Sequence, residues 1–238
     1  MGQQVISAGA HHILFDPDFA PHFQPEQFQP DWWITRGGVV GQAAGRGAVS
    51  FVRAADMVWA LRHYRRGGWA ARLSRDAYVW TGLAHTRPWR EWTVTARLRA
   101  LGLPVPEPVA AHVERRGLVY RGDLITRRID GARPLAEHLA QAPLPRECWT
   151  GLGTLLRRFH DAGLRHDDIN VRNVLLDPQG RFHLIDFDKS RLAAPGRWRA
   201  ANLARFRRSL EKLGPSAPGI SFREPDWQAL LTGYAAAP

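Results

Sequence analysis

Polar residues in one short stretch of the chain have the types and spacing of a reactive site. The segment 166–173 fits the pattern H-x-D-x-x-x-x-N, with Asp168 as its aspartate and Asn173 at its end. Thirteen residues later, Asp186 begins an Asp-Phe-Asp triplet. Transfer of a phosphoryl group needs a carboxylate that orients the attacking hydroxyl and hard oxygen ligands that hold Mg²⁺. The spacing therefore predicts that Asp168 is the catalytic carboxylate and that Asn173 and Asp186 are magnesium ligands.

A solvated acidic loop that only caps two strands is the alternative explanation for these residues. A histidine–x–aspartate motif followed by an asparagine arises by chance fairly often. The distance from Asn173 to Asp186, with two apolar strands and a turn between them and a long helix before, is much harder to obtain by chance. Asp167 is a poorer candidate base by register, and His166 is expected to pack and hydrogen-bond the loop.

Glycines and one charged pair in the first half of the chain could hold a nucleotide. Gly45 and Gly47 lie between two predicted strands, where backbone amides could approach phosphates because glycine has no Cβ. The same glycines could also mean only a turn. Arg62 lies on the next strand, and Glu91, in the helix after Pro88, is its candidate partner. An exposed strand arginine and a surface glutamate are the alternatives.

The hydrophobic pattern divides the chain into a β-rich part and an α-rich part. Strands are predicted at 39–41, 48–52, 58–64, 109–114, 118–121 and 124–129, with one helix at 88–101. Helices are then predicted at 134–141, 146–162 and 198–212, and short strands at 174–176 and 183–185. Residues 16–31 are predicted to be an irregular lead-in. We expect one α+β domain, 1–238, with lobes at about 32–130 and about 131–238 that meet near Asp130-Gly131.

The chain is strongly basic, and its positive charge comes almost entirely from arginine. The net charge is +11, and Lys189 and Lys212 are the only lysines among 33 basic residues. Codon bias, a basic solvated surface or an anionic partner would each explain this. Cys148 is the single cysteine, which excludes an internal disulfide, and no His/Asp motif marks it as a nucleophile. Neither a signal peptide nor an apolar run of membrane-spanning length is predicted.

These motifs resemble those of the protein-kinase-like superfamily and, more narrowly, of the 3-deoxy-D-manno-octulosonic acid (Kdo) kinases of Gram-negative bacteria. The narrower resemblance lies in Leu-Arg-His-Tyr-Arg-Arg-Gly-Gly (61–68), Leu-Gly-Leu-Pro-Val-Pro (101–106), Leu-Ile-Thr-Arg-Arg-Ile (124–129) and Leu-Ile-Asp-Phe-Asp (184–188). It extends from about residue 32 to 210. The His-x-Asp motif is shared widely, whereas the Asp-Phe-Asp triplet and the Arg-His-Tyr-x-Arg-Gly-Gly strand end are more specific.

The resemblance implies a two-lobed protein-kinase-like fold and a particular reaction. Such kinases transfer the γ-phosphate of ATP, with Mg²⁺, to the 4-hydroxyl of a Kdo residue on a lipid A precursor (Kdo-lipid IVA) in lipopolysaccharide core biosynthesis. The implied location is peripheral, at the cytoplasmic face of the inner membrane. The implied partners are the lipid-linked Kdo acceptor and the anionic membrane surface, and no nucleic acid is expected. The basic clusters 65–66, 72–75 and 197–208 would face anionic lipid or simply be solvated.

Two positions depart from the protein-kinase pattern and leave other functions open. Protein kinases have a lysine on the third strand, where this chain has Arg62 on the same strand face as Ala60. Arginine is longer and planar, so the phosphate contact would differ. Asp188 replaces the glycine of Asp-Phe-Gly and would add charge near the metal or hydrogen-bond the loop. A heptose kinase, a protein kinase and a nucleotide-binding pseudokinase are the alternatives, whereas no recognition motif supports nucleic-acid binding.

Overall fold

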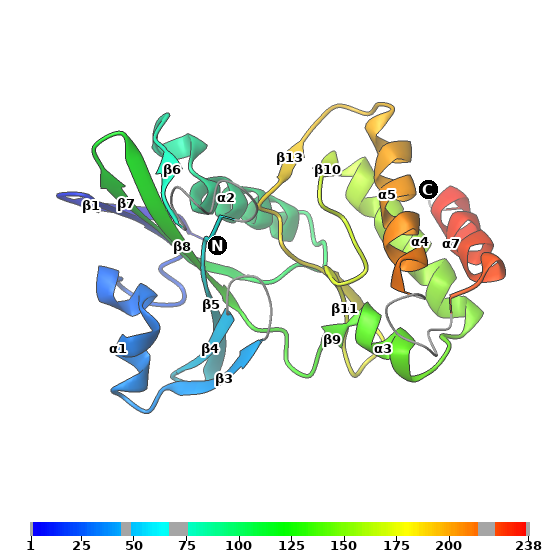
Figure 1. Cartoon of the computed structure of the whole chain (residues 1–238), viewed down its shortest axis with the longest axis horizontal. Helices are drawn as coiled ribbons and strands as arrows, with labels where there is room; N and C mark the ends of the chain where they lie inside the picture. The colour runs from blue at the N-terminus through cyan, green and yellow to red at the C-terminus, as the bar shows by residue number, and fades with distance from the viewer. Residues whose placement is uncertain (1, 44–48, 67–75, 214–221, 237–238) are drawn as a thin grey trace. The chain divides into compact units, whose positions relative to one another are not determined.

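The computed structural model describes residues 2–43, 49–66, 76–213 and 222–236, so Gly45 and Gly47 lie outside the described residues. Two compact units divide the chain (Figure 1). Unit 1 consists of residues 1–96 and 106–128, and unit 2 of residues 97–105 and 129–238. In the described part of the chain, no helix has the length and apolar character that a membrane crossing requires.

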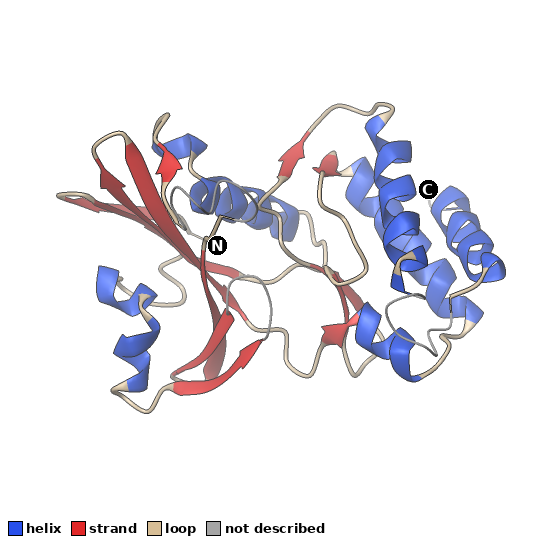
Figure 2. Cartoon of the chain, in the orientation of Figure 1, coloured by secondary structure: helices blue, strands red, loops and turns tan. Residues whose placement is uncertain are grey.

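An antiparallel sheet is the framework of unit 1. Its strands follow the order β1-β2-β7-β8-β5-β4-β3, and the short strand β6 also pairs with β8. The strands are β1 Gln4–Ala8, β2 His11–Phe15, β3 Val39–Ala43, β4 Val49–Ala54, β5 Met57–His63, β6 Tyr78–Val79, β7 Pro108–Arg116 and β8 Val119–Arg127. Figure 2 shows these strands in red, with the helices of the chain in blue.

Apolar side chains cover both faces of this sheet. Phe15 belongs to a buried cluster with Phe28 and Trp33, which come from the segment between β2 and β3. Its neighbour Leu14 belongs to another buried cluster, with Trp92. Alternate residues of a strand point to opposite faces, which is why the two neighbours join different clusters. The elements that supply the covering residues are η1 Pro25–Phe28, α1 Pro30–Ile34 and α2 Arg87–Ala100, and a short 3-10 turn, η3 Leu83–His85, precedes α2.

Unit 1 differs from the sequence-based prediction at four places. Residues 16–31 were predicted to be an irregular lead-in, which is wrong for the part that forms η1 and the start of α1. Strands β1 and β2 were not predicted, and the short strand β6 lies in a stretch with no clear pattern. Residues 118–121 and 124–129 were predicted as separate strands, which is wrong, because β8 runs through both without a break. Gly122 lies between the two predicted segments, and a Cβ there would lie 2.4 Å from Pro88 Cγ. This glycine therefore marks the close approach of α2 to the sheet.

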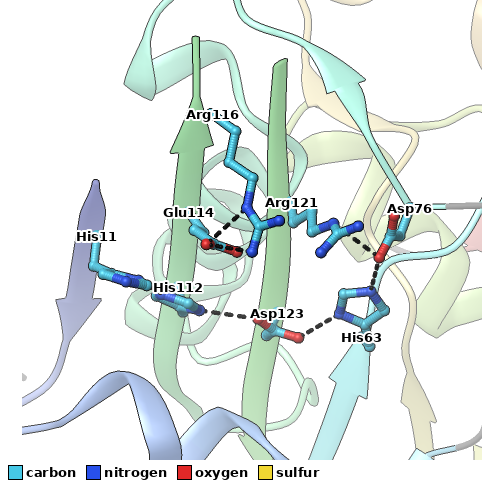
Figure 3. Close-up of polar contacts among 8 residues, drawn as sticks. All are labelled: His11, His63, Asp76, His112, Glu114, Arg116, Arg121 and Asp123. Carbon is cyan, nitrogen blue, oxygen red and sulfur yellow. Dashed lines mark hydrogen bonds and ion pairs between the residues drawn. The ribbon is translucent and has the colours of Figure 1, made fainter. Parts of the chain in front are cut away.

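A chain of hydrogen bonds runs across four strands of this sheet (Figure 3). One carboxylate oxygen of Asp123 lies 2.9 Å from His112 Nδ1, and the other lies 2.6 Å from His63 Nδ1. His112 Nε2 lies 3.0 Å from His11 Nδ1, and His63 Nε2 lies 3.3 Å from Asp76 Oδ2. An ionised carboxylate only accepts, so both histidines donate to Asp123 from Nδ1. The bonds join β2, β7, β8 and β5, and His63, their member on β5, is the neighbour of Arg62 in the sequence.

Helices make up most of unit 2. They are α3 Leu135–Gln141, α4 Arg146–Asp161, α5 Trp198–Glu211 and α7 Glu224–Ala236. Two small antiparallel sheets accompany them: β9 Arg133–Pro134 with β11 Val174–Leu176 and β12 Phe182–Leu184, and β10 Leu164–His166 with β13 Ser190–Leu192. The predicted helices 134–141, 146–162 and 198–212 agree closely with α3, α4 and α5, whereas α7, β10 and β13 were not predicted. The β-rich and α-rich parts confirm the predicted α+β fold.

Helices α4 and α7 pack closely because each has a glycine at the contact. A Cβ on Gly153 would lie 1.9 Å from the Leu230 carbonyl oxygen, and one on Gly233 would lie 2.0 Å from that of Thr150. Two backbones can approach this closely only where neither has a side chain.

We expect Gly153→Ala to lower the free energy of unfolding by about 1–3 kcal/mol, because the added methyl group overpacks the α4–α7 contact. Gly151 provides a matched control on the same helix, since a Cβ there meets nothing within 4 Å. Gly151→Ala should stabilise by about 0.5–1 kcal/mol through helix propensity alone. Thermal unfolding of the two variants measures both effects. Equal melting temperatures would contradict the proposed packing.

Candidate active site

His166 holds the loop that carries Asp168. The residue is buried at the end of β10, and its Nδ1 accepts the backbone N–H of Asp168 at 3.3 Å. Its hydrogen is therefore on Nε2, which lies 3.4 Å from the Ile185 carbonyl oxygen. Burial lowers the pKa of His166, which keeps the ring neutral for these two bonds. The expected packing and hydrogen-bonding role of His166 is confirmed.

The β11–β12 hairpin brings Asn173 and Asp186 to the same end of one element. Val174, the first residue of β11, pairs with Leu184, the last residue of β12. Asn173 and Asp186 flank this pair, and the Ile185 N–H donates to the Asn173 carbonyl oxygen at 3.0 Å. Asn173 Nδ2 in turn donates to the Asp168 carbonyl oxygen at 3.2 Å. Unit 2 therefore brings the three predicted residues together.

Asp186 has a backbone conformation that non-glycine residues seldom adopt. Its φ is +63°, in the left-handed region. Aspartate tolerates this region better than most residues, yet the conformation still costs free energy, and such strain concentrates at functional sites. The next residue, Phe187, is buried, and its ring lies 5.6 Å from that of His166. The left-handed backbone of Asp186 and the burial of Phe187 together fix the position of the Asp186 backbone, from which the carboxylate extends.

Asp177 stabilises the turn at the other end of the hairpin. Its carboxylate accepts the backbone N–H groups of Gln179 and Arg181 at 3.0 and 2.9 Å, and His183 Nε2 lies at 2.9 Å. Burial acts to raise its pKa, but these hydrogen bonds and the Arg181 guanidinium outweigh burial and lower the pKa to about 2. The Asp-Pro-Gln-Gly turn was visible in the sequence, and Asp177 makes it rigid.

The two adjacent carboxylates of the loop have different surroundings. Asp167 accepts Arg165 Nε at 2.7 Å and Arg191 Nη1 at 3.0 Å, one on each oxygen. Arg165 and Arg191 pair directly across β10 and β13, where two like charges would repel, so Asp167 neutralises them. Asp168 lies beyond this cluster, with its side chain 41% exposed. Asp167 therefore has a structural role between these two strands, and the role of Asp168 as the catalytic carboxylate stays a prediction.

Two cations that contact Asp168 were missed by the sequence analysis. Lys189 Nζ lies 3.2 Å from Asp168 Oδ2, and Arg205 Nη1 lies 3.8 Å from Oδ1. Lys189 immediately follows the Asp-Phe-Asp triplet, and Arg205 lies on α5. The scarcity of lysine was the only sequence signal for Lys189, whereas nothing in the spacing links α5 to the loop.

Unit 1 forms the predicted pair between Arg62 and Glu91. Arg62, on β5, donates to the Glu91 carboxylate on α2, and the same oxygen accepts the Tyr64 hydroxyl. Glu91 is 3% exposed, and the Arg62 guanidinium also lies 4.8 Å from the centre of the Tyr64 ring. The pairing of Arg62 with Glu91 is confirmed, while its role toward a nucleotide stays a prediction. Tyr64, the third member of this group, was not predicted as a site residue.

The residues of unit 2 fit a magnesium ion that arrives with a nucleotide. Asn173 uses its Nδ2 in the bond to Asp168, so its Oδ1 is the atom that would face a metal. Together with the Asp186 carboxylate it provides hard oxygen ligands, and Mg²⁺ commonly takes one or two protein ligands plus phosphates and water. Among the described residues, no group of three His, Cys, Asp or Glu could hold a metal alone. Such a donor set suits a nucleotide-bound ion.

This fold and this site define a kinase of the protein-kinase-like class: a β-rich unit with an arginine–glutamate pair, and an α-rich unit with the Asp168, Asn173 and Asp186 set. Comparison of the sequence then identifies the family. Residues 30–234 match the lipopolysaccharide kinase (Kdo/WaaP) family. The chain belongs to this family, which confirms the predicted resemblance and the prediction that the protein is a kinase.

Similar proteins from several bacteria have one name. A 3-deoxy-D-manno-octulosonic acid kinase of Photobacterium profundum is 41% identical over 222 residues, which cover 93% of this chain and 94% of that protein. Proteins of the same name from Actinobacillus succinogenes and Vibrio cholerae are 40% and 38% identical. The first covers 93% of this chain and 95% of its own length, and the second 88% and 89%. The likeness therefore extends over almost the whole chain.

Proposed function

We propose that the protein transfers the γ-phosphate of ATP to the 4-hydroxyl of a Kdo residue on a lipid A precursor. The observation that carries the proposal is the Asp168, Asn173 and Asp186 set: Asn173 is hydrogen-bonded to Asp168 and to Ile185, the residue before Asp186. The shared name of the relatives supports Kdo as the acceptor. Lipopolysaccharide core biosynthesis is the setting in which this reaction would take place.

In this mechanism Asp168 orients the acceptor hydroxyl and takes its proton. The acceptor oxygen bonds to the γ-phosphorus while the bond from phosphorus to the β–γ bridging oxygen breaks, and ADP leaves with that electron pair. His166 fixes the backbone of Asp168, and therefore the position from which the carboxylate acts. Mg²⁺, held by Asn173 Oδ1 and Asp186, would neutralise phosphate charge.

Arg62 would hold the nucleotide phosphates in place of the lysine of protein kinases. Glu91 fixes its guanidinium on one side, and the Tyr64 ring supports it on another. A pre-oriented guanidinium loses less side-chain entropy when it binds phosphate than a free one. Gly45 and Gly47 are proposed to cover the phosphates, as the glycine-rich loops of other kinases do.

We expect Arg62→Ala to raise the KM for ATP about tenfold, which corresponds to ~1.4 kcal/mol of binding free energy. The KM for the acceptor should change little, because Arg62 is assigned to the nucleotide only. Steady-state kinetics with each substrate varied in turn measures both values. An unchanged KM for ATP would rule out Arg62 as the phosphate ligand.

A heptose kinase and a protein kinase are the alternative functions to be tested, whereas the match to a kinase family argues against the pseudokinase. Purified protein should be incubated with radiolabelled ATP, Mg²⁺ and one acceptor at a time: Kdo-lipid IVA, a heptose-bearing core fragment, free sugars or a protein mixture. Label on Kdo-lipid IVA alone is the expected result. Label on the heptose fragment alone or on the protein mixture alone would overturn the Kdo assignment, and no label on any acceptor would contradict the proposed reaction.

We also propose that the protein binds peripherally to an anionic membrane surface, where its lipid-linked acceptor resides. Support comes from the end of the β7–β8 hairpin, where Leu118 is 83% exposed. Val79 of the adjacent β6 is 66% exposed, and Arg115 and Arg116 lie beside them on β7. Exposed apolar side chains with cations beside them suit the interface of an anionic bilayer, although one of the two arginines, Arg116, is paired with Glu114. Sedimentation with vesicles of neutral or anionic lipid tests this. Equal binding to the two kinds of vesicle, or binding to neither, would contradict it.

A further inference from the structure

The cations around Asp168 contribute little to the stability of the fold. Lys189 is 57% exposed, Arg205 is exposed to a similar extent, and Asp168 is itself accessible. Ion pairs at such positions typically contribute ~0.2–1 kcal/mol, and ordering a lysine side chain costs as much or more. Their placement on the proposed catalytic carboxylate therefore calls for a different explanation.

The two carboxylates of this loop are outnumbered by the cations that contact them. Arg165 and Arg191 contact Asp167, while Lys189 and Arg205 contact Asp168. Four cations thus face the two carboxylates of the loop, while Asp186 and Asp188 of the adjoining triplet add two negative charges that a bound Mg²⁺ would offset. Such a surplus attracts an anionic group to the immediate neighbourhood of the carboxylate that is to meet the acceptor hydroxyl.

Lys189 also departs from the composition of the chain. Only two of the 33 basic residues are lysines, and one of them contacts Asp168. A lysine has a compact, rotatable ammonium group, whereas arginine has a larger planar group with fixed donor directions. An ammonium can contact Asp168 and a second anion at the same time, because it has three donors.

We propose that Lys189 and Arg205 form a subsite for the carboxylate of the acceptor sugar. This inference rests on the proposed function, in which the acceptor is an octulosonic acid. When the acceptor hydroxyl approaches Asp168, the sugar brings its own carboxylate toward an ionised aspartate, and the two would repel. Lys189 and Arg205, already on the two oxygens of Asp168, offset this repulsion and bind the incoming carboxylate. The subsite would make the enzyme selective for an acidic sugar.

A second anion could also use these cations, namely the phosphoryl group in transfer. The two assignments predict different kinetics for variants of Lys189 and Arg205 when the acceptor has no carboxylate. A carboxylate subsite matters only when the acceptor has its carboxylate. A phosphoryl clamp matters equally for every acceptor, since all of them receive the same phosphoryl group.

The test uses two matched acceptors, Kdo-lipid IVA and its derivative with the Kdo carboxylate converted to the methyl amide. The kcat/KM of the native enzyme should be at least tenfold higher for the acid. In Lys189→Met and in Arg205→Gln, kcat/KM for the acid should fall at least tenfold more than for the amide. The loss should appear mainly in the KM of the acid acceptor. Lys189→Arg should retain part of the preference for the acid acceptor. Lys212→Met, which changes the other lysine of the chain, should have the kinetics of the native enzyme.

Each outcome decides the proposal. Equal losses for acid and amide would overturn the subsite and favour the phosphoryl clamp. Unchanged kinetics in both variants, or a native enzyme that uses acid and amide equally well, would also overturn it. If the native enzyme labels neither acceptor, the proposed Kdo kinase function itself fails, which is a distinct result. Circular dichroism and thermal unfolding of each variant separate these effects from misfolding.

Discussion

Asp168→Asn is expected to lower kcat for phosphate transfer by about 100-fold or more, because the amide cannot take the proton of the acceptor hydroxyl. The substitution keeps the size of the side chain, and the backbone bond from Asp168 to His166 is unaffected. The melting temperature should therefore stay within a few degrees of that of the native protein, as expected for an exposed ion-pair residue. Initial rates with saturating ATP and acceptor measure the effect.

Asp167→Asn is the matched control for this prediction. Asp167 is the neighbouring carboxylate on the same loop, but it neutralises Arg165 and Arg191 and is not assigned to the acceptor. Its loss should lower the free energy of unfolding by about 1 kcal/mol and reduce kcat much less than the loss of Asp168. Comparable loss of kcat in both variants would mean that the loop as a whole, and not the Asp168 carboxylate, is needed.

Asp123→Asn should lower the free energy of unfolding by about 3 kcal/mol, because it breaks a buried charged network (Figure 3). Asp123 is buried, and His112 and His63 both donate to it, so an amide would leave one donor without an acceptor. For a chain of this length the melting temperature should fall by about 6–12 °C. Glu114→Gln, which removes an exposed pair with Arg116 on the same strand, should cost less than about 1 kcal/mol. Equal decreases in the melting temperatures of the two variants would contradict a stabilising role for the network.

The same network predicts how stability depends on pH. The hydrogen bond to Asp123 raises the pKa of His63 above 6.5. The contribution of His63 to the free energy of unfolding is therefore complete below pH 6.5 and is lost as pH rises through the raised pKa. Burial acts to raise the pKa of Asp123, but hydrogen bonds from His112 and His63 lower it below 3.8. That contribution is present above pH 3.8 and is lost as pH falls through the lowered pKa. The native protein should therefore lose stability above pH 6.5 more steeply than Asp123→Asn does.

The site residues that sequence analysis found are those whose arrangement depends on local structure. Asn173 and Asp186 come together because a short hairpin lies between them, and strand–turn–strand patterns are visible in the sequence. The Arg62–Glu91 pair was predicted from the kinase pattern, which encodes a contact across 29 residues. The main helices and most strands were predicted for the same reason, since their hydrophobic period is a local property.

The features that sequence analysis missed depend on contacts between distant segments. Nothing in the spacing indicated that Arg205, on α5, would contact Asp168. The bond from His11 to His112 joins residues 101 positions apart, and β1 is exposed along its whole length, so its sequence has no alternating pattern. Helix α7 packs on α4 through Gly233, a residue that lowers helix propensity and so hides the helix. Tertiary packing determines these features, and the local patterns of a single sequence do not show which distant segments come into contact.

The central claim is that Asp168 directs phosphate from ATP onto a Kdo hydroxyl. The most direct measurement compares label transfer from γ-labelled ATP to Kdo-lipid IVA by the native protein, Asp168→Asn and Asp167→Asn, at equal concentrations of folded protein. The account predicts labelled lipid with the native protein, a reduced amount with Asp167→Asn and almost none with Asp168→Asn. Label transfer at the native rate by Asp168→Asn, or no transfer by the native protein, would contradict it.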